Sequence, residues 1–202
     1  GYREVNFSLP RDRQKILNRQ TIYDATWEKT PSMGWGFVPL TAYHGGGADA
    51  VLEPLNEHLK DYKQLMMQYY GAGIQACYRG PRLYDTEETK ATVIGVIDWY
   101  KKYRDILNAD IVRLRRADGR DWDGWMHVDP KGKEKGLIML FNPTSEVMKK
   151  QISLPLYYTG LTETASIRTE EGLAKKYTLT RNYEAEVKIE IPANGYIWLV
   201  VE

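Results

Sequence analysis

The stretch at residues 86–107, TEETKATVIGVIDWYKKYRDIL, predicts one long amphipathic helix that separates two kinds of sequence pattern. Thr86 suits the N-cap position, and the two glutamates after it match the positive end of the helix dipole. Apolar and aromatic side chains then recur at helical spacing. Before this segment helices and strands alternate, and after it the pattern is all-β. We therefore expect one domain at 1–108, ending with this helix, and a second at 109–202.

The first domain shows the alternation that is typical of a parallel α/β unit. Helical spacing predicts helices over about 11–27 and 55–70, and short apolar runs bounded by Gly and Pro predict strands over 33–40 and 73–78. A parallel sheet of only two strands needs cover on both of its faces and both of its edges. We therefore expect this pair of strands to be a remnant of a (β/α) barrel. An exposed edge of this pair should drive self-association or leave the first part partly disordered.

The second domain consists of short alternating runs separated by turn signals, which predict an antiparallel β-sandwich of roughly eight strands. The runs at 136–142 and 195–201 contain the fewest polar residues. They should be central strands, because only a strand covered on both faces tolerates so little polarity. The predicted fold class is therefore α+β, a partial (β/α) barrel followed by a β-sandwich.

The amino-acid composition narrows the classes of binding partner that this protein could have. The formal net charge is only +1, so no basic surface favours nucleic acid. No apolar run approaches ~18 residues, so we expect no membrane span. The 6 Trp and 15 Tyr, against 3 Phe, suit either a core or stacking on sugars.

The sequence carries no cofactor or metal motif. The glycines at 45–47 lack the GK[ST] of a phosphate loop, and no GxGxxG is present. The three histidines and the single cysteine, Cys77, do not have zinc-ligand spacing. An EF-hand alignment on Asp123-Gly124 places Gly119 and Pro130 at ligand positions, so it fails. We therefore expect no metal and no cofactor.

Candidate ligand-facing residues follow the two predicted parallel strands, because loops after strands face the ligand in a parallel barrel. They are Tyr43 and His44 after the first strand and Tyr78, Arg79, Arg82 and Asp85 after the second. Arg79 could hydrogen-bond a polar ligand in a bidentate way. The alternative stays open that Arg79 and Arg82 pair with nearby acids and fix the loop.

Five stretches carry a family resemblance: TAYHGGG at 41–47, QACYRGPRLYD at 75–85, WYKKYRDIL at 99–107, RADGRDWDGWMHVDP at 116–130 and KGLIMLFNPT at 135–144. Together they resemble the C-terminal part of bacterial glycoside hydrolases related to α-galactosidases. The resemblance implies a catalytic (β/α)8 barrel, with 33–40 and 73–78 similar to its last two strands, followed by a β-sandwich. It also implies a carbohydrate partner. The catalytic carboxylates of such enzymes sit on earlier barrel strands that are not in this chain, so no catalytic residue is assigned.

We therefore expect a C-terminal fragment of a glycoside hydrolase that is inactive by itself. The alternative is a stand-alone carbohydrate-binding or interaction module. The α/β segment ahead of the sandwich favours the fragment, because a self-contained binding module has no need of an incomplete barrel. A signal peptide on the parent protein would make it periplasmic or secreted, and the sequence does not otherwise indicate a location.

Overall fold

The computed structural model describes residues 9–25, 35–42 and 46–202, and the chain divides into two compact units at 1–107 and 108–202. The first unit mixes helices and strands, whereas regular structure in the second is almost entirely β. Across the described ranges, no helix combines the length and the apolar character that a membrane span requires.

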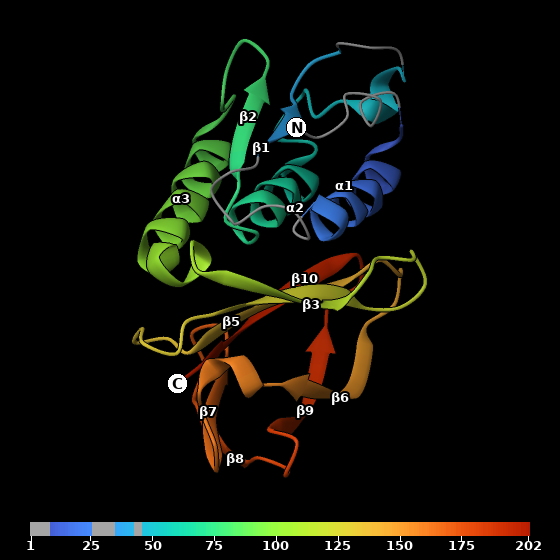
Figure 1. Cartoon of the computed structure of the whole chain (residues 1–202). Coiled ribbons are helices and arrows are strands. Elements are labelled where there is room, and N and C mark those ends of the chain that lie inside the picture. The colour runs from blue at the N-terminus through green and yellow to red at the C-terminus, as the bar shows by residue number, and fades with distance from the viewer. Residues whose placement is uncertain (1–8, 26–34, 43–45) are drawn as a thin grey trace. The chain divides into compact units, whose positions relative to one another are not determined.

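The first unit has the expected alternation of helices and strands. Its elements are α1 (Arg11–Ala25), β1 (Trp35–Pro39), the 3₁₀ turn η2 (Ala48–Ala50), α2 (Leu59–Tyr70), β2 (Gln75–Arg79) and α3 (Glu87–Leu107). Strands β1 and β2 pair in parallel, from Trp35 opposite Gln75 to Pro39 opposite Arg79. Helix α2 lies between α1 and α3 and packs against both strands (Figure 1).

Helix α3 begins where its capping chemistry predicts. The Thr86 side-chain Oγ1 accepts a hydrogen bond from the Thr89 backbone N–H at 3.2 Å, which satisfies one free donor of the first turn. The buried side chains of the helix recur at helical spacing and are Thr89, Val96, Tyr103, Ile106 and Leu107. The predicted amphipathic helix at 86–107 is therefore confirmed to within one residue.

Helix α1 buries a side that is mostly polar and also carries Ile22. Gln14 and Lys15 are at most 5% exposed, and Asn18 and Arg19 are buried with them. The Lys15 ammonium lies 2.5 Å from a carboxylate oxygen of Asp61 on α2. The Gln14 amide donates to the backbone carbonyl of Ala50 at 2.6 Å. This helix is therefore held in place by polar contacts to α2 and η2.

The second unit is built from two antiparallel sheets. Its strands are β3 (Asp110–Arg115), β4 (Asp123–Val128), β5 (Gly136–Asn142), β6 (Met148–Pro155), β7 (Thr164–Thr169), β8 (Lys175–Thr178), β9 (Glu184–Ile191) and β10 (Gly195–Val201). Six strands pair in the order β3-β4-β5-β10-β7-β8, and β6 pairs with β9. The two runs predicted to be central, β5 and β10, are the middle pair of the six-stranded sheet, so that prediction is confirmed.

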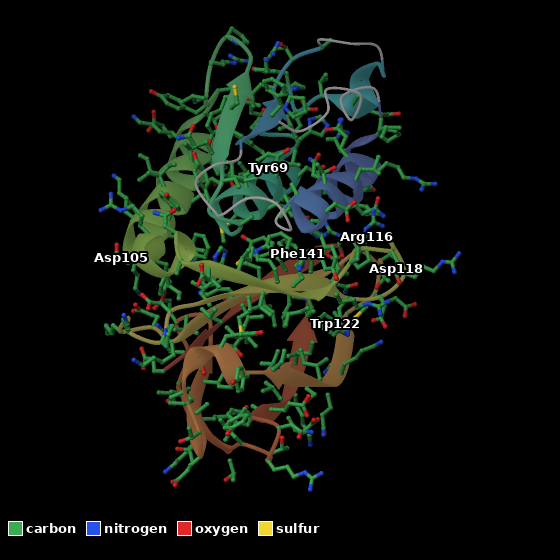
Figure 2. All side chains as sticks on the ribbon, in the orientation of Figure 1. Tyr69, Asp105, Arg116, Asp118, Trp122 and Phe141 are labelled. Atoms are coloured by element: carbon green, nitrogen blue, oxygen red, sulfur yellow. The ribbon has the colours of Figure 1, made fainter. Side chains whose placement is uncertain are left out.

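The β6–β9 pair packs against one face of the six-stranded sheet. Strand β9 alternates strictly, with Ala185, Val187, Ile189 and Ile191 buried and the residues between them exposed. These side chains share one core with apolar residues of β4, β5, β7 and β10, and Trp122 packs against that core (Figure 2). Alternation with period two therefore gives one apolar core between two sheets.

Candidate functional site

The candidate site lies where the two parallel strands end, and strand alternation divides its residues between two faces. Gly36 on β1 faces α2, because a Cβ at that position would lie 2.3 Å from the ring of Tyr69. Val38 and its register partner Tyr78 lie on the same face as Gly36. Figure 2 labels Tyr69, whose hydroxyl donates to the backbone carbonyl of Phe37 at 2.8 Å. This face is therefore the one that α2 covers.

Tyr78 takes part in a cluster of tyrosines on the helix-covered face. Its hydroxyl lies 3.1 Å from the hydroxyl of Tyr70, and its ring meets that of Tyr62 edge-on with centroids 6.3 Å apart. Burial raises the pKa of the Tyr78 hydroxyl, and the hydrogen bond to Tyr70 raises it further. The contacts of Tyr78 are thus with side chains of α2, and the hydroxyl stays neutral at physiological pH.

Arg79 belongs to the opposite face of the strand pair. This distal face carries Phe37 from β1 and Gln75, Cys77 and Arg79 from β2, which alternate with the helix-facing residues. The Arg79 guanidinium lies over the Phe37 ring, 4.1 Å from its centroid, while Gln75 and Cys77 are exposed. Stacking on an aromatic ring orients the planar guanidinium.

Arg82 forms a bidentate ion pair with a residue far away in sequence. Its Nε and Nη2 donate to the two carboxylate oxygens of Glu53 at 2.9 and 2.8 Å. The pair joins the loop after β2 to the segment that precedes α2. The contact of Arg82 in the structure is therefore the one that the alternative interpretation describes, an ion pair with an acid that fixes the loop.

Asp85 also holds the loop. Its carboxylate accepts hydrogen bonds from the backbone N–H of Asn56 at 3.0 Å and the hydroxyl of Thr89 at 2.8 Å. Desolvation opposes ionisation of this carboxyl, but these hydrogen bonds outweigh it and lower its pKa. The nearby hydroxyl of Tyr62 donates to the backbone carbonyl of Leu83 at 2.9 Å. The loop at 80–86 is thus fixed at three points.

The structure separates the sequence-predicted site residues into groups with different contacts. Arg79 lies on the distal face, Tyr78 contacts helix side chains, and Arg82 and Asp85 hold the loop. Tyr43 and His44 lie outside the described residues. The partners Glu53, Asn56 and Tyr62 were not predicted, and no local signal could have identified them, because they lie 21 to 29 positions away from the residues they hold. Within the described ranges, no group of three or more His, Cys, Asp or Glu side chains could hold a metal ion.

Comparison with known sequences finds no match, either among protein-family models or among curated proteins. Comparison with solved structures finds the fold in glycosidases. A family 27 β-L-arabinopyranosidase of Geobacillus stearothermophilus aligns with a TM-score of 0.59 at 15% identity, over 95% of this chain and 43% of its own. A family 36 α-galactosidase of the same species aligns with a TM-score of 0.53 at 17% identity, over 81% of this chain and 21% of its own.

A third solved structure shows the same likeness with a lower TM-score. α-Galactosidase I of Mortierella vinacea aligns with a TM-score of 0.50 at 13% identity, over 74% of this chain and 38% of its own. The chain spans less than half the length of each of these neighbours. At such identities the likeness establishes the fold, and at that level the resemblance to α-galactosidase-type glycoside hydrolases is confirmed.

Proposed function

We propose that this chain is the C-terminal part of a glycoside hydrolase of the α-galactosidase type. The observation that carries the proposal is the alignment over 95% of the chain with a family 27 glycosidase, which runs through the parallel strand pair and the antiparallel sheets alike. A likeness confined to the sandwich would have been weaker support, because sandwiches host many unrelated functions. The first unit then contributes the last two strands and the last helix of a catalytic barrel.

In this proposal the distal face of the strand pair belongs to the interior of the barrel. The ends of parallel barrel strands carry the residues that contact the ligand. Arg79 is then the described residue best placed to hydrogen-bond a sugar hydroxyl, because stacking on Phe37 orients its guanidinium. Tyr43 and His44, which follow β1 in sequence, are also proposed as residues of the sugar site.

The proposal assigns the catalytic carboxylates to strands outside this chain. A glycosidase needs two carboxyl groups across the glycosidic bond, and the acid must keep its proton near neutral pH. Glu53 is paired in bidentate fashion with Arg82. Asp85 has a lowered pKa, so it is ionised near neutrality and cannot donate a proton there. Neither of these carboxylates beside the strand ends is suited to be the acid.

An activity measurement on two forms of the protein tests the proposal. The chain 1–202 should not hydrolyse aryl α-galactosides, whereas the polypeptide extended by the sequence encoded upstream of Gly1 should. In the extended form, Arg79→Ala should raise KM more than it lowers kcat, because the side chain would bind the sugar without touching the reacting atoms. Turnover by 1–202 alone, or no glycosidase activity in the extended form, would contradict the proposal.

The free edges of the strand pair give a second measurable consequence. Among the described residues, no further strand pairs with β1 or β2, and the outer edge of β1 receives a backbone hydrogen bond only near its end, where the Leu52 N–H donates to the Pro39 carbonyl at 3.1 Å. Unpaired edges are templates for pairing with another chain. We therefore expect the chain 1–202 to self-associate as its concentration rises, measured by light scattering, and the extended form to remain monomeric under the same conditions.

A further inference from the structure

Two neighbouring tyrosines on the second unit are unusually exposed. Tyr157 and Tyr158, in the 3₁₀ turn η3 (Tyr157–Thr159), are 62% and 61% exposed. Their rings meet edge-on with centroids 5.2 Å apart, and the ring of Tyr183 meets that of Tyr157 at 5.4 Å. Isolated exposed apolar side chains need no explanation, but three clustered aromatic rings do. We call these three residues the tyrosine cluster.

The turn that carries two of these rings is anchored from within. Leu156 and Thr159, on either side of the two tyrosines, are at most 1% exposed. The Thr159 hydroxyl donates to the backbone carbonyl of Leu156 at 2.6 Å, which closes the turn. Gly160 ends the turn in the left-handed region, with φ of 77°. Inward anchors on both sides leave Tyr157 and Tyr158 pointing outward on a fixed backbone.

The third ring comes from a second loop under backbone strain. Tyr183 has a φ of 61°, a conformation that bulky side chains rarely adopt. Thr180 maintains it: its hydroxyl oxygen accepts from the backbone N–H groups of Asn182 and Glu184, and its carbonyl accepts from that of Tyr183 at 2.9 Å. The Leu156 N–H donates to the Tyr183 carbonyl at 2.9 Å and joins the two loops. Such strain persists where the surroundings over-determine it, often at functional sites.

We propose that the tyrosine cluster is a carbohydrate-binding platform, separate from the barrel site. Tyrosine offers a flat apolar face for a sugar ring and a hydroxyl for its edge, and a fixed platform loses little entropy on binding. The rings meet at 84° and 68°, so their faces point in different directions and suit a chain of sugars better than one ring. Arg181 and Asn182, exposed in the second loop, supply donors beside them. The choice of carbohydrate as the ligand class rests on the proposed function; the geometry of the platform does not.

A protein partner fits the cluster less well. A stable protein interface buries about 800 Å² on each side, whereas a fully buried aromatic side chain contributes about 150–250 Å². Three partly exposed tyrosines supply well under that area. The exposed apolar residues elsewhere on this unit, Val147 and Leu173, lie in other loops and belong to neither η3 nor the Tyr183 turn.

Affinity electrophoresis of the chain 1–202 through gels that contain galactomannan, arabinogalactan or starch tests the platform. We expect retardation by at least one of these polysaccharides. The double variant Tyr157→Ala/Tyr158→Ala should lose about tenfold or more in affinity, by analogy with the stacking of bases on aromatic rings. Tyr157→Phe should keep most of the binding, since it keeps the ring, and Leu173→Ala, a substitution at the 93% exposed Leu173, should keep all of it.

Several results would overturn the platform. The first is that no polysaccharide retards the wild type, and the second is that the double variant is retarded as strongly as the wild type. The third is that the double variant loses binding to single-stranded RNA, or self-association, instead of polysaccharide binding. Near-ultraviolet circular dichroism of each variant checks that the sandwich is intact, and Tyr183→Phe provides a milder variant should the double variant misfold. The result is independent of the glycosidase assay, because that assay depends on the extended polypeptide and on Arg79, not on these tyrosines.

Discussion

In the second unit the strands bury alternating apolar side chains between two sheets, whereas helices α1 and α2 of the first unit bury polar side chains beside apolar ones such as Ile22, Leu65 and Met66. Gln14, Lys15, Asn18 and Arg19 on α1 and Gln64 and Gln68 on α2 are all at most 5% exposed. The side-chain amide of Gln68 has no hydrogen-bond partner among the described residues. Buried polar groups are tolerated when they are paired and costly when they are not. The first unit therefore depends on individual polar contacts in addition to apolar packing, whereas the second is closed mainly by apolar packing.

The largest expected effect is on the second unit, where two backbones meet at Gly124. A Cβ at this position would lie 2.1 Å from the backbone carbonyl oxygen of Met139 on the paired strand, and a backbone atom in a central sheet cannot move aside. Gly124→Ala should therefore reduce the free energy of unfolding by about 3 kcal/mol, measured by urea denaturation. The control is Gly95→Ala in α3, where nothing lies within 4 Å, which should stabilise by about 0.5–1 kcal/mol. Equal effects of the two substitutions would contradict the close approach.

A smaller effect is expected where the first unit has its own close approach. Gly36→Ala would place a methyl group against the ring of Tyr69, which is 1% exposed and hydrogen-bonded to Phe37. A side chain can shift more easily than a backbone, so we expect a loss of about 2 kcal/mol. Tyr69→Leu in the Gly36→Ala background should restore part of it, and a double-mutant cycle measures the coupling. Strict additivity of the two substitutions would argue against this packing.

A third prediction concerns the polar interior of the first unit. Asp61→Asn removes the charge that faces the Lys15 ammonium, whose side chain is only 7% exposed. The loss of unfolding free energy should be about 1 kcal/mol, less than for a fully buried pair, because Asp61 is 24% exposed and Asp12 still contacts Lys15. The double variant Lys15→Met/Asp61→Leu should recover this loss, since apolar packing can replace an ion pair. A double variant less stable than Asp61→Asn would show that the polar contacts are required.

The smallest effect is a pH dependence at the start of α3. Hydrogen bonds from Asn56 and Thr89 outweigh the desolvation of Asp85 and hold its folded-state pKa below the unfolded value of about 3.9. Its contribution to stability is therefore complete above that unfolded value and is lost as the pH falls through the folded pKa. Denaturation of the wild type and of Asp85→Asn at pH 6 and pH 3 should show a smaller difference between them at the lower pH. Glu88→Gln, an exposed change in the same helix, serves as the control.

Some of the candidate site could be predicted from local pattern, and some could not. The strand-then-loop pattern indicated the segment after β2 as a group, and helical spacing with a capping threonine identified α3. Pattern alone did not separate Tyr78 from Arg79, because which of two adjacent strand residues faces a helix depends on where that helix packs. The partner of Arg82 was also beyond reach, since Glu53 lies 29 positions away and is brought close only by folding.

The sequence by itself determined the order of helices and strands, the central position of β5 and β10, and the change to an all-β pattern after α3. These features follow from hydrophobic periodicity and capping, which act over a few residues. Only the tertiary structure decided which side of α1 is buried, which residues hold the loop at 80–86, and that three tyrosines from two loops meet on the surface. Those outcomes depend on contacts between residues that are distant in the chain. Hydrophobic periodicity does not specify which of these residues meet.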